Sequence, residues 1–154
     1  MIDCMNYELF MGEALAEARA ALADGLPAVG AIAVVDEAMV ARGSNRAGET
    51  ADPTAHPVVT VIRETARRLG SPRLSDVTVF TTLEPCAMCV GALLACDAVA
   101  LVYAAPNPVD GAAGSVLQLA HHPALGRRLQ VVSGIRREEA EELAGIPTEE
   151  PTGA

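Results

Sequence analysis

The sequence lacks long hydrophobic segments: no apolar run reaches the roughly 18 residues that a membrane-spanning helix requires. The first residues also lack the basic and then apolar pattern of an export signal. Both absences predict a soluble cytoplasmic protein. Proline and glycine are scattered, and 51% of the 154 residues are hydrophobic, which predicts an ordered chain with a single core.

Lysine is absent, and the eleven basic residues, all arginine, are outnumbered by 20 acidic residues to give a formal net charge of −9. Proteins that capture nucleic acid electrostatically neutralise its phosphates, so this balance argues against broad nucleic-acid binding. Four of the arginines lie close together late in the chain: Arg127, Arg128, Arg136 and Arg137. A solvated face is a simpler interpretation of these residues than a basic patch.

Cysteine is scarce, but two of the four cysteines form a Cys-x-x-Cys pair, Cys86 and Cys89. In a chain without an export signal, this spacing indicates metal binding or redox chemistry rather than a disulfide framework. Cys4 and Cys96 have no such spacing, and we interpret both as structural.

Apolar periodicity predicts a helix and a hairpin at the start of the chain. Residues 6–23 show helical spacing and end at Asp24–Gly25. The spaced residues are Tyr7, Phe10, Met11, Leu15, Ala18 and Leu22. Residues 29–35 and 39–43 are short and apolar, and they flank an acidic pair, which predicts a β-hairpin.

A second helix is predicted over about residues 55–69, capped by Thr54 and ended by Gly70. Its predicted buried side is formed by Val58, Val61, Ile62, Thr65 and Leu69. Later in the chain we predict strands over residues 77–82, 98–103 and 129–133, and helices over residues 86–95 and 136–143. A weakly helical stretch precedes the last strand.

Strands that alternate with helices of this length predict a three-layer α/β domain around a mixed sheet. The sheet is expected to begin with the antiparallel hairpin and to continue through helical crossovers. We expect residues 1–145 to form this single domain and residues 146–154 to form a polar tail.

Two helix starts carry the residues that a metal ion would need. Cys86 and Cys89 open a helix directly after a strand, and His56 opens another helix thirty residues upstream. Free backbone N–H groups at a helix start favour thiolates. Two thiolates and one imidazole leave the fourth tetrahedral position open, as in a catalytic zinc site. The alternative is a thiol redox pair.

Four segments carry a family resemblance: DPTAH, TLEPCAMCVGAL, DGAAGS and HHP. In this order they resemble bacterial tRNA adenosine deaminases, within the cytidine/deoxycytidylate deaminase superfamily and its H-x-E…P-C-x-x-C signature. Guanine and other free-base deaminases share the first two segments. The resemblance covers roughly residues 7–143. The motif around Cys86 is highly specific, whereas His121–His122–Pro123 is more simply a helix-ending loop without chemistry.

The resemblance implies a three-layer α/β/α cytidine-deaminase-like fold with a mixed five-stranded sheet. It makes His56, Cys86 and Cys89 the ligands of a zinc ion. It also places Asn45, with the backbone around Ala55 and Pro85, at a substrate that is a nucleobase, a nucleoside or a similar amidine. Members of the family associate through helices near the active site, so a homodimer is expected.

One residue departs from the family pattern. The family has glutamate two residues after the zinc histidine, where it carries protons between water and the substrate. This chain has Val58 there, and the next carboxylate, Glu64, is about 9 Å further along the helix. General acid–base groups are typically worth about 10²–10⁴ in rate, so we expect strongly impaired deamination.

Two functions therefore remain open from the sequence. The first is a zinc-dependent hydrolytic deaminase with low or altered activity. The alternative is an inactive zinc-binding deaminase-fold protein that acts as a ligand-binding module or as one subunit of a heterodimer with an active paralogue. The predicted C-terminal helix ends in acidic and small residues, without the basic and aromatic residues that would hold an anticodon stem, which argues against tRNA binding.

Overall fold

The computed structural model describes residues 5–146, so Cys4 and residues 147–154 of the expected tail lie outside the described part. Within it, five strands form one sheet in the order β2-β1-β3-β4-β5. The strands are β1 Gly30–Val35, β2 Ala38–Ser44, β3 Thr78–Leu83, β4 Ala100–Ala105 and β5 Gln130–Ser133. The helices are α1 Tyr7–Ala23, α2 Ala47–Thr50, α3 Pro57–Leu69, α4 Ala87–Ala95 and α5 Arg137–Ala144, with a 3-10 turn, η2, at Pro123–Leu125.

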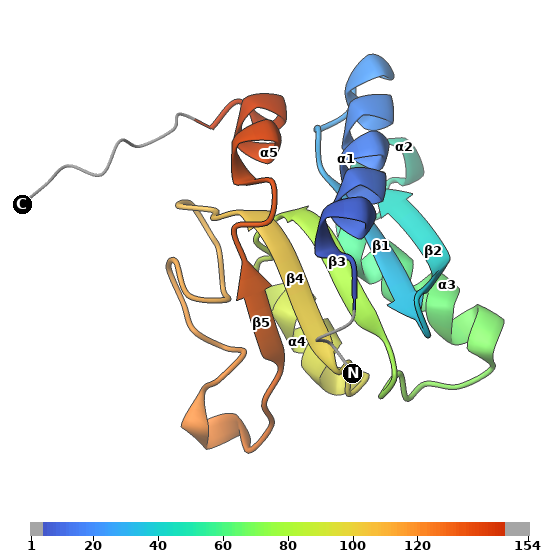
Figure 1. The fold of residues 1–154 in the computed structure, drawn as a ribbon, viewed down its shortest axis with the longest axis vertical. Coiled ribbons are helices and arrows are strands. Elements are labelled where there is room, and N and C mark those ends of the chain that lie inside the picture. Colours follow the sequence, from blue (N-terminus) through green and yellow to red (C-terminus); the bar gives the residue numbers. More distant parts are fainter. Residues whose placement is uncertain (1–4, 147–154) are drawn as a thin grey trace, which may run out of the picture.

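The sheet is mixed and is covered on both faces. β1 pairs antiparallel with β2 and β3, whereas β3, β4 and β5 are parallel. Helices α1 and α5 pack on one face, and α3 and α4 lie behind the other (Figure 1). Each face has its own buried apolar cluster. The described residues therefore confirm the three-layer α/β/α architecture and the mixed five-stranded sheet.

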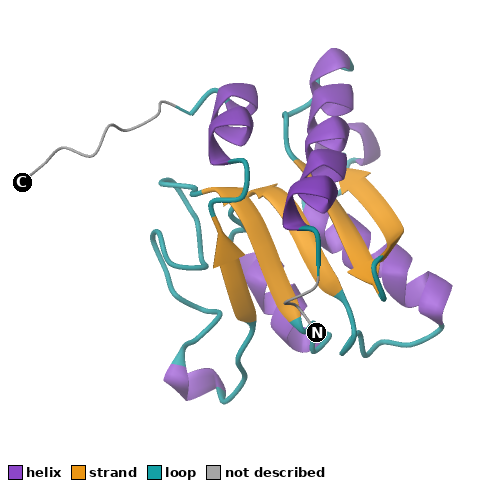
Figure 2. Cartoon of the chain, viewed as in Figure 1, coloured by secondary structure: helices purple, strands orange, loops and turns teal. Residues whose placement is uncertain are grey.

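The central strands β3 and β4 are buried along almost their whole length, as expected for parallel strands covered by helices on both faces. Helix α4 is the one α-helical crossover between parallel strands in residues 5–146, and it joins β3 to β4. A long loop with the short η2 turn joins β4 to β5 (Figure 2), so the weakly helical stretch expected there is reduced to this 3-10 turn. No helix among the described residues is long and apolar enough to span a membrane.

The start of α3 also corrects the sequence analysis. Thr54 does not cap this helix, because its hydroxyl donates to Asp52 Oδ1 at 2.6 Å and its backbone N–H donates to the same oxygen. The N-cap is His56, whose extended backbone suits a residue before proline. Pro57 then occupies the first helical position, where its missing N–H costs little.

Leu22 and Leu69 are exposed, although both were placed on the apolar sides of their helices. The C-terminal ends of α1 and α3 extend past the sheet (Figure 1), which leaves their last turns uncovered. Helix α2 was also missed, because four residues are too few to show a helical period. The remaining boundaries agree with the sequence analysis to within about two residues.

Candidate metal centre and substrate pocket

Helices α3 and α4 pack against each other on one face of the sheet and begin close together. Their N-cap residues are His56 and Cys86, and Cys89 lies in the first turn of α4. Both N-caps are in extended backbone, and Pro85 and Pro57 flank these starts. The fold thus brings together three potential ligands that lie up to 33 residues apart.

The three ligand atoms have the spacing of a tetrahedral metal site. His56 Nδ1 lies 3.6 Å from the Sγ atoms of both Cys86 and Cys89, and the two sulfurs are 3.7 Å apart. Zinc bonds of about 2.3 Å to sulfur and about 2.0–2.1 Å to nitrogen give tetrahedral edges of about 3.8 and 3.6 Å. In residues 5–146 this is the one group of three or more such side chains that could hold a metal ion.

The surroundings of Cys89 disfavour its thiolate unless a cation is bound beside it. Burial raises the pKa of the Cys89 thiol well above its ordinary value, and the neighbouring Cys86 raises it further. A divalent cation would reverse this preference, because metal-bound cysteine is deprotonated. The donor set and the ligand spacing therefore fit zinc.

A pocket opens beside the three ligands. It is lined by Val29, Asn45, His56, Pro57, Val58, Thr81, Leu83, Glu84, Pro85, Cys86, Cys89, Asn107 and Asp110. Asn45 and Pro85, both assigned to substrate from the resemblance, are in this lining. Ala55 is buried and is not in the lining, and its carbonyl oxygen accepts a hydrogen bond from the Arg46 N–H.

Asn45 presents a defined polar group to the pocket. Its Oδ1 accepts a hydrogen bond from the Ala47 N–H at 3.1 Å, and this bond fixes the side chain at the end of β2. The oxygen is therefore engaged locally, which leaves the Nδ2 donors for a ligand. A ring nitrogen or a carbonyl oxygen is an acceptor of suitable chemistry.

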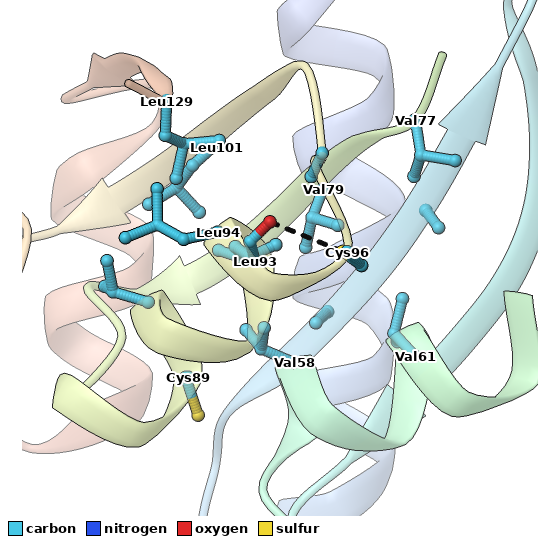
Figure 3. Packing of buried hydrophobic residues seen from close by; sticks show 14 of the residues in the cluster. Val58, Val61, Val77, Val79, Cys89, Leu93, Leu94, Cys96, Leu101 and Leu129 are labelled. Carbon is cyan, nitrogen blue, oxygen red and sulfur yellow. Dashed lines mark hydrogen bonds between the residues drawn. The ribbon is translucent and has the colours of Figure 1, made fainter. Parts of the chain in front are cut away.

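Val58 lies two residues beyond His56, in the first turn of α3. Its side chain is 2% exposed and lines the pocket. It also belongs to the apolar cluster that contains Cys89 and Leu93 (Figure 3). This wall of the pocket is therefore apolar at the position next to the metal ligands.

Glu84 is a site residue that the sequence analysis did not single out. Its side chain is 1% exposed, and its carboxylate accepts hydrogen bonds from the backbone N–H groups of Asn107, Ala113 and Ser115 and from the Ser115 hydroxyl. These contacts hold the loop after β4 against the start of α4. A charged residue between an apolar strand and Pro85 was the available sequence signal.

The remaining candidates lie outside the pocket. Glu64 pairs with Arg67 and Arg68, and their hydrogen bonds lower its pKa to about 2. The His121 ring contacts the Leu129 carbonyl oxygen at 2.7 Å, and His122 accepts from the Ala124 N–H. The histidines therefore stabilise the loop before β5.

Three of the four clustered arginines have acidic partners rather than forming a free basic patch. Arg136 pairs with Glu139 and Arg137 pairs with Glu141. Arg127 lies near Asp97 and donates to the Leu94 carbonyl oxygen at 2.8 Å. Cys96, interpreted as structural, is buried and its thiol donates to the Leu93 carbonyl oxygen (Figure 3).

Residues 5–105, which include all three ligands, match the family model of the cytidine and deoxycytidylate deaminase zinc-binding region. The chain belongs to the cytidine and deoxycytidylate deaminase family. The match to a zinc-binding region and the geometry of His56, Cys86 and Cys89 together indicate zinc as the metal of this family member.

Relatives within the family act on different substrates. The chain is 35% identical to a tRNA-specific adenosine deaminase of Bacillus subtilis, over 86% of this chain and 82% of that protein. It is 38% identical to a guanine deaminase of the same organism, over 71% of each. A structure from a study of A-to-I editing by tRNA:A34 deaminases superposes with a TM-score of 0.84 at 36% identity, over 87% of this chain and 97% of that one.

Two other relatives are much longer than the matched region. The chain is 46% identical over 112 residues to the chloroplastic tRNA(adenine(34)) deaminase of Arabidopsis thaliana but spans only 9% of that protein. It is 44% identical over 135 residues to a tRNA(Ile)-lysidine synthase of Deinococcus radiodurans and spans 23% of it.

Proposed function

We propose that this family member binds zinc together with a nucleobase or nucleoside that carries a cyclic amidine, and that it deaminates this ligand by hydrolysis far more slowly than its relatives do. The observation that carries the proposal is the buried Val58 in the wall of the pocket that holds the zinc ligands. Valine has no ionisable group, so its side chain can neither donate nor accept a proton. When bound, the zinc ion would supply a nucleophile by lowering the pKa of a water molecule to about 7.

The chain's own residues support a small aromatic ligand. Asn45 offers amide donors, and Pro57, Val58 and Leu83 offer apolar surface in the same pocket. We place the backbone around Pro85 and Ala55 beside the ligand. The net charge of −9 and the ion pairs that occupy Arg136 and Arg137 favour a free base or nucleoside over tRNA.

Restoring the family residue tests this proposal. Zinc-loaded wild-type protein and Val58→Glu are compared for ammonia release from adenine, guanine, cytosine and their nucleosides. We expect Val58→Glu to release ammonia about 10²–10⁴ times faster from at least one of them, the typical worth of a general acid–base group. Thr60→Glu is the matched control, because it adds the same charge to α3 at a residue outside the pocket lining.

Zinc content and circular dichroism establish that each variant folds. A folded, zinc-bound Val58→Glu protein that turns over none of these compounds would overturn the assignment of Val58 to the proton-carrying position. If the wild-type protein released ammonia as fast as Val58→Glu does, the proposed impairment of the wild-type rate would be wrong.

The second candidate function is an inactive partner subunit, and the outer side of α4 favours association. This helix is entirely apolar in sequence, and Ala87, Met88, Gly91 and Ala95 are exposed on it. We propose that this face packs against a second copy of the chain, as family members associate near the active site, and that an active paralogue could take the place of that copy. Burial of apolar surface is the driving force.

Gly91 allows a clean test of this association. A Cβ atom at Gly91 would meet nothing within 4 Å, so Gly91→Glu leaves the monomer unstrained and places a charge in the proposed interface. Gly48→Glu in α2 is the matched control, since a Cβ atom there also meets nothing. We expect only Gly91→Glu to give a monomer by sedimentation velocity. A wild-type monomer would overturn the homodimer.

A further inference from the structure

Within the described residues, two carboxylates line the pocket, Glu84 and Asp110. Glu84 is buried, and four donors from the loop occupy its oxygens. A proton carrier must exchange protons with water and with substrate, and the two donors on each oxygen of Glu84 already occupy the positions that such an exchange needs. Asp110 is exposed to the solvent side of the pocket.

Asp110 is held in a defined position by its neighbours. Asn107 Nδ2 donates to Asp110 Oδ1 at 2.6 Å, and Asn107 Oδ1 accepts from the Val109 and Asp110 N–H groups. The Asn107 N–H in turn donates to Glu84 Oε1 at 3.1 Å. A chain of hydrogen bonds therefore runs from the buried Glu84 to Asp110, and no described residue donates to Asp110 Oδ2.

Asp110 shares the pocket with the metal ligands. It lines the same pocket as His56, Cys86 and Cys89, and it lies in the loop after β4, whereas Val58 lines this pocket from α3.

We propose that Asp110 is the proton-carrying carboxylate of this pocket, with Asn107 as its positioning residue. The assignment rests on the proposed function, and it identifies the source of the proton that Val58 cannot supply. It also explains how a slow hydrolysis could persist in a pocket whose first helical turn is apolar.

Besides substrate and water, the proton balance requires only one carboxylate. Hydrolytic deamination forms a bond from the water oxygen to the amidine carbon and breaks the bond from that carbon to the amino nitrogen. One proton of the water ends on the ring nitrogen and the other on the departing ammonia. A carboxylate that accepts each proton from the oxygen and delivers it to nitrogen returns to its starting form.

Proton transfer is separable from ammonia release with ligands that carry hydrogen in place of the amino group. Purine riboside and pyrimidin-2-one riboside add water across the ring C=N bond, and this addition requires a proton on the ring nitrogen. Calorimetry measures binding, and the change in ultraviolet absorbance of the bound ligand measures the rate of hydration. The proteins are zinc-loaded wild type, Asp110→Asn, Val58→Glu, the double variant and Asp76→Asn, an exposed aspartate outside the pocket.

We expect Asp110→Asn to bind zinc and ligand as wild type does but to hydrate the ligand about 10²–10⁴ times more slowly. The double variant should recover hydration through the glutamate, and Asp76→Asn should match wild type. An unchanged hydration rate in Asp110→Asn would overturn the assignment of Asp110 and leave the proposed function standing. Loss of bound zinc from Asp110→Asn would show that Asp110 has a structural role, and this result would also overturn the assignment.

The other outcomes separate this assignment from the proposed function. Binding without hydration in wild type, with hydration in Val58→Glu, would show that Asp110 carries no proton and that the chain is the inactive form. Absence of binding in both wild type and Val58→Glu would overturn the proposed function, and this assignment with it.

Discussion

Ser115 contacts the carboxylate of Glu84 twice, through its backbone N–H at 3.1 Å and through its hydroxyl, although the two residues are 31 positions apart. Glu84 lies directly after β3, before α4, and Ser115 lies in the loop after β4. This pair therefore fixes the loop that carries Asn107 and Asp110 to the element that carries two of the metal ligands.

Glu84→Gln should destabilise the protein by about 1–3 kcal/mol, because the amide presents donors to N–H and O–H groups that need an acceptor in a buried position. The measurement is urea unfolding of the zinc-loaded protein, together with hydrogen exchange of the Ala113 and Ser115 amides. Ser115→Ala removes only the hydroxyl donor and should cost less. Equal stability of Glu84→Gln and wild type would contradict the role of Glu84.

The outline of the fold could be predicted from the sequence because local patterns determine it. Short-range signals exist for the apolar strands β3 and β4, for the end of α1 just before Gly25, and for the acidic pair between β1 and β2. The metal ligands could be predicted as well, since a Cys-x-x-Cys pair at a helix start and an upstream histidine form a recognisable motif.

Other parts depend on contacts between distant segments. Glu84 binds the loop that carries Asp110 to the pocket, and no local pattern encodes a hydrogen bond over 23 residues. Thr54 illustrates a local competition: it has the chemistry of a cap, but Asp52 and Arg63 engage its side chain instead.

Zinc should bind to one site that requires all three ligands. His56→Ala and Cys89→Ala should each lose zinc, measured as metal per chain after gel filtration, and should unfold at a lower temperature than wild type because metal binding stabilises the folded state. Cys96→Ala is the matched control, since its thiol contacts the Leu93 carbonyl oxygen and no ligand. Full zinc content in Cys89→Ala would rule out the tetrahedral site.

The turn between β1 and β2 should accept glycine with a gain in stability. Asp36 and Glu37 have φ angles of 49° and 62°, a left-handed conformation that non-glycine residues adopt at a cost. Asp-Gly is a preferred sequence for such two-residue turns. Glu37→Gly should therefore stabilise the protein by about 0.5–1 kcal/mol in urea unfolding. Glu37→Ala, which removes the same carboxylate and keeps a Cβ atom, should show no such gain, and equal effects would refute the explanation.

Gly30 should be intolerant of a methyl group, because α1 lies directly against the start of β1. A Cβ atom at Gly30 would lie 2.3 Å from the Ala14 carbonyl oxygen and 2.7 Å from the Ala18 nitrogen, both in the backbone of α1. Gly30→Ala must therefore displace a whole helix, and we expect a loss of about 1–3 kcal/mol or more in urea unfolding.

Gly48→Ala provides the comparison for Gly30→Ala, since the same added methyl group meets nothing within 4 Å in α2. This variant should be neutral or stabilised by up to about 1 kcal/mol, because alanine favours helix more than glycine does. Both variants should retain zinc, because neither residue lines the pocket. If Gly30→Ala unfolded at the same urea concentration as Gly48→Ala, the close contact between α1 and β1 would be wrong.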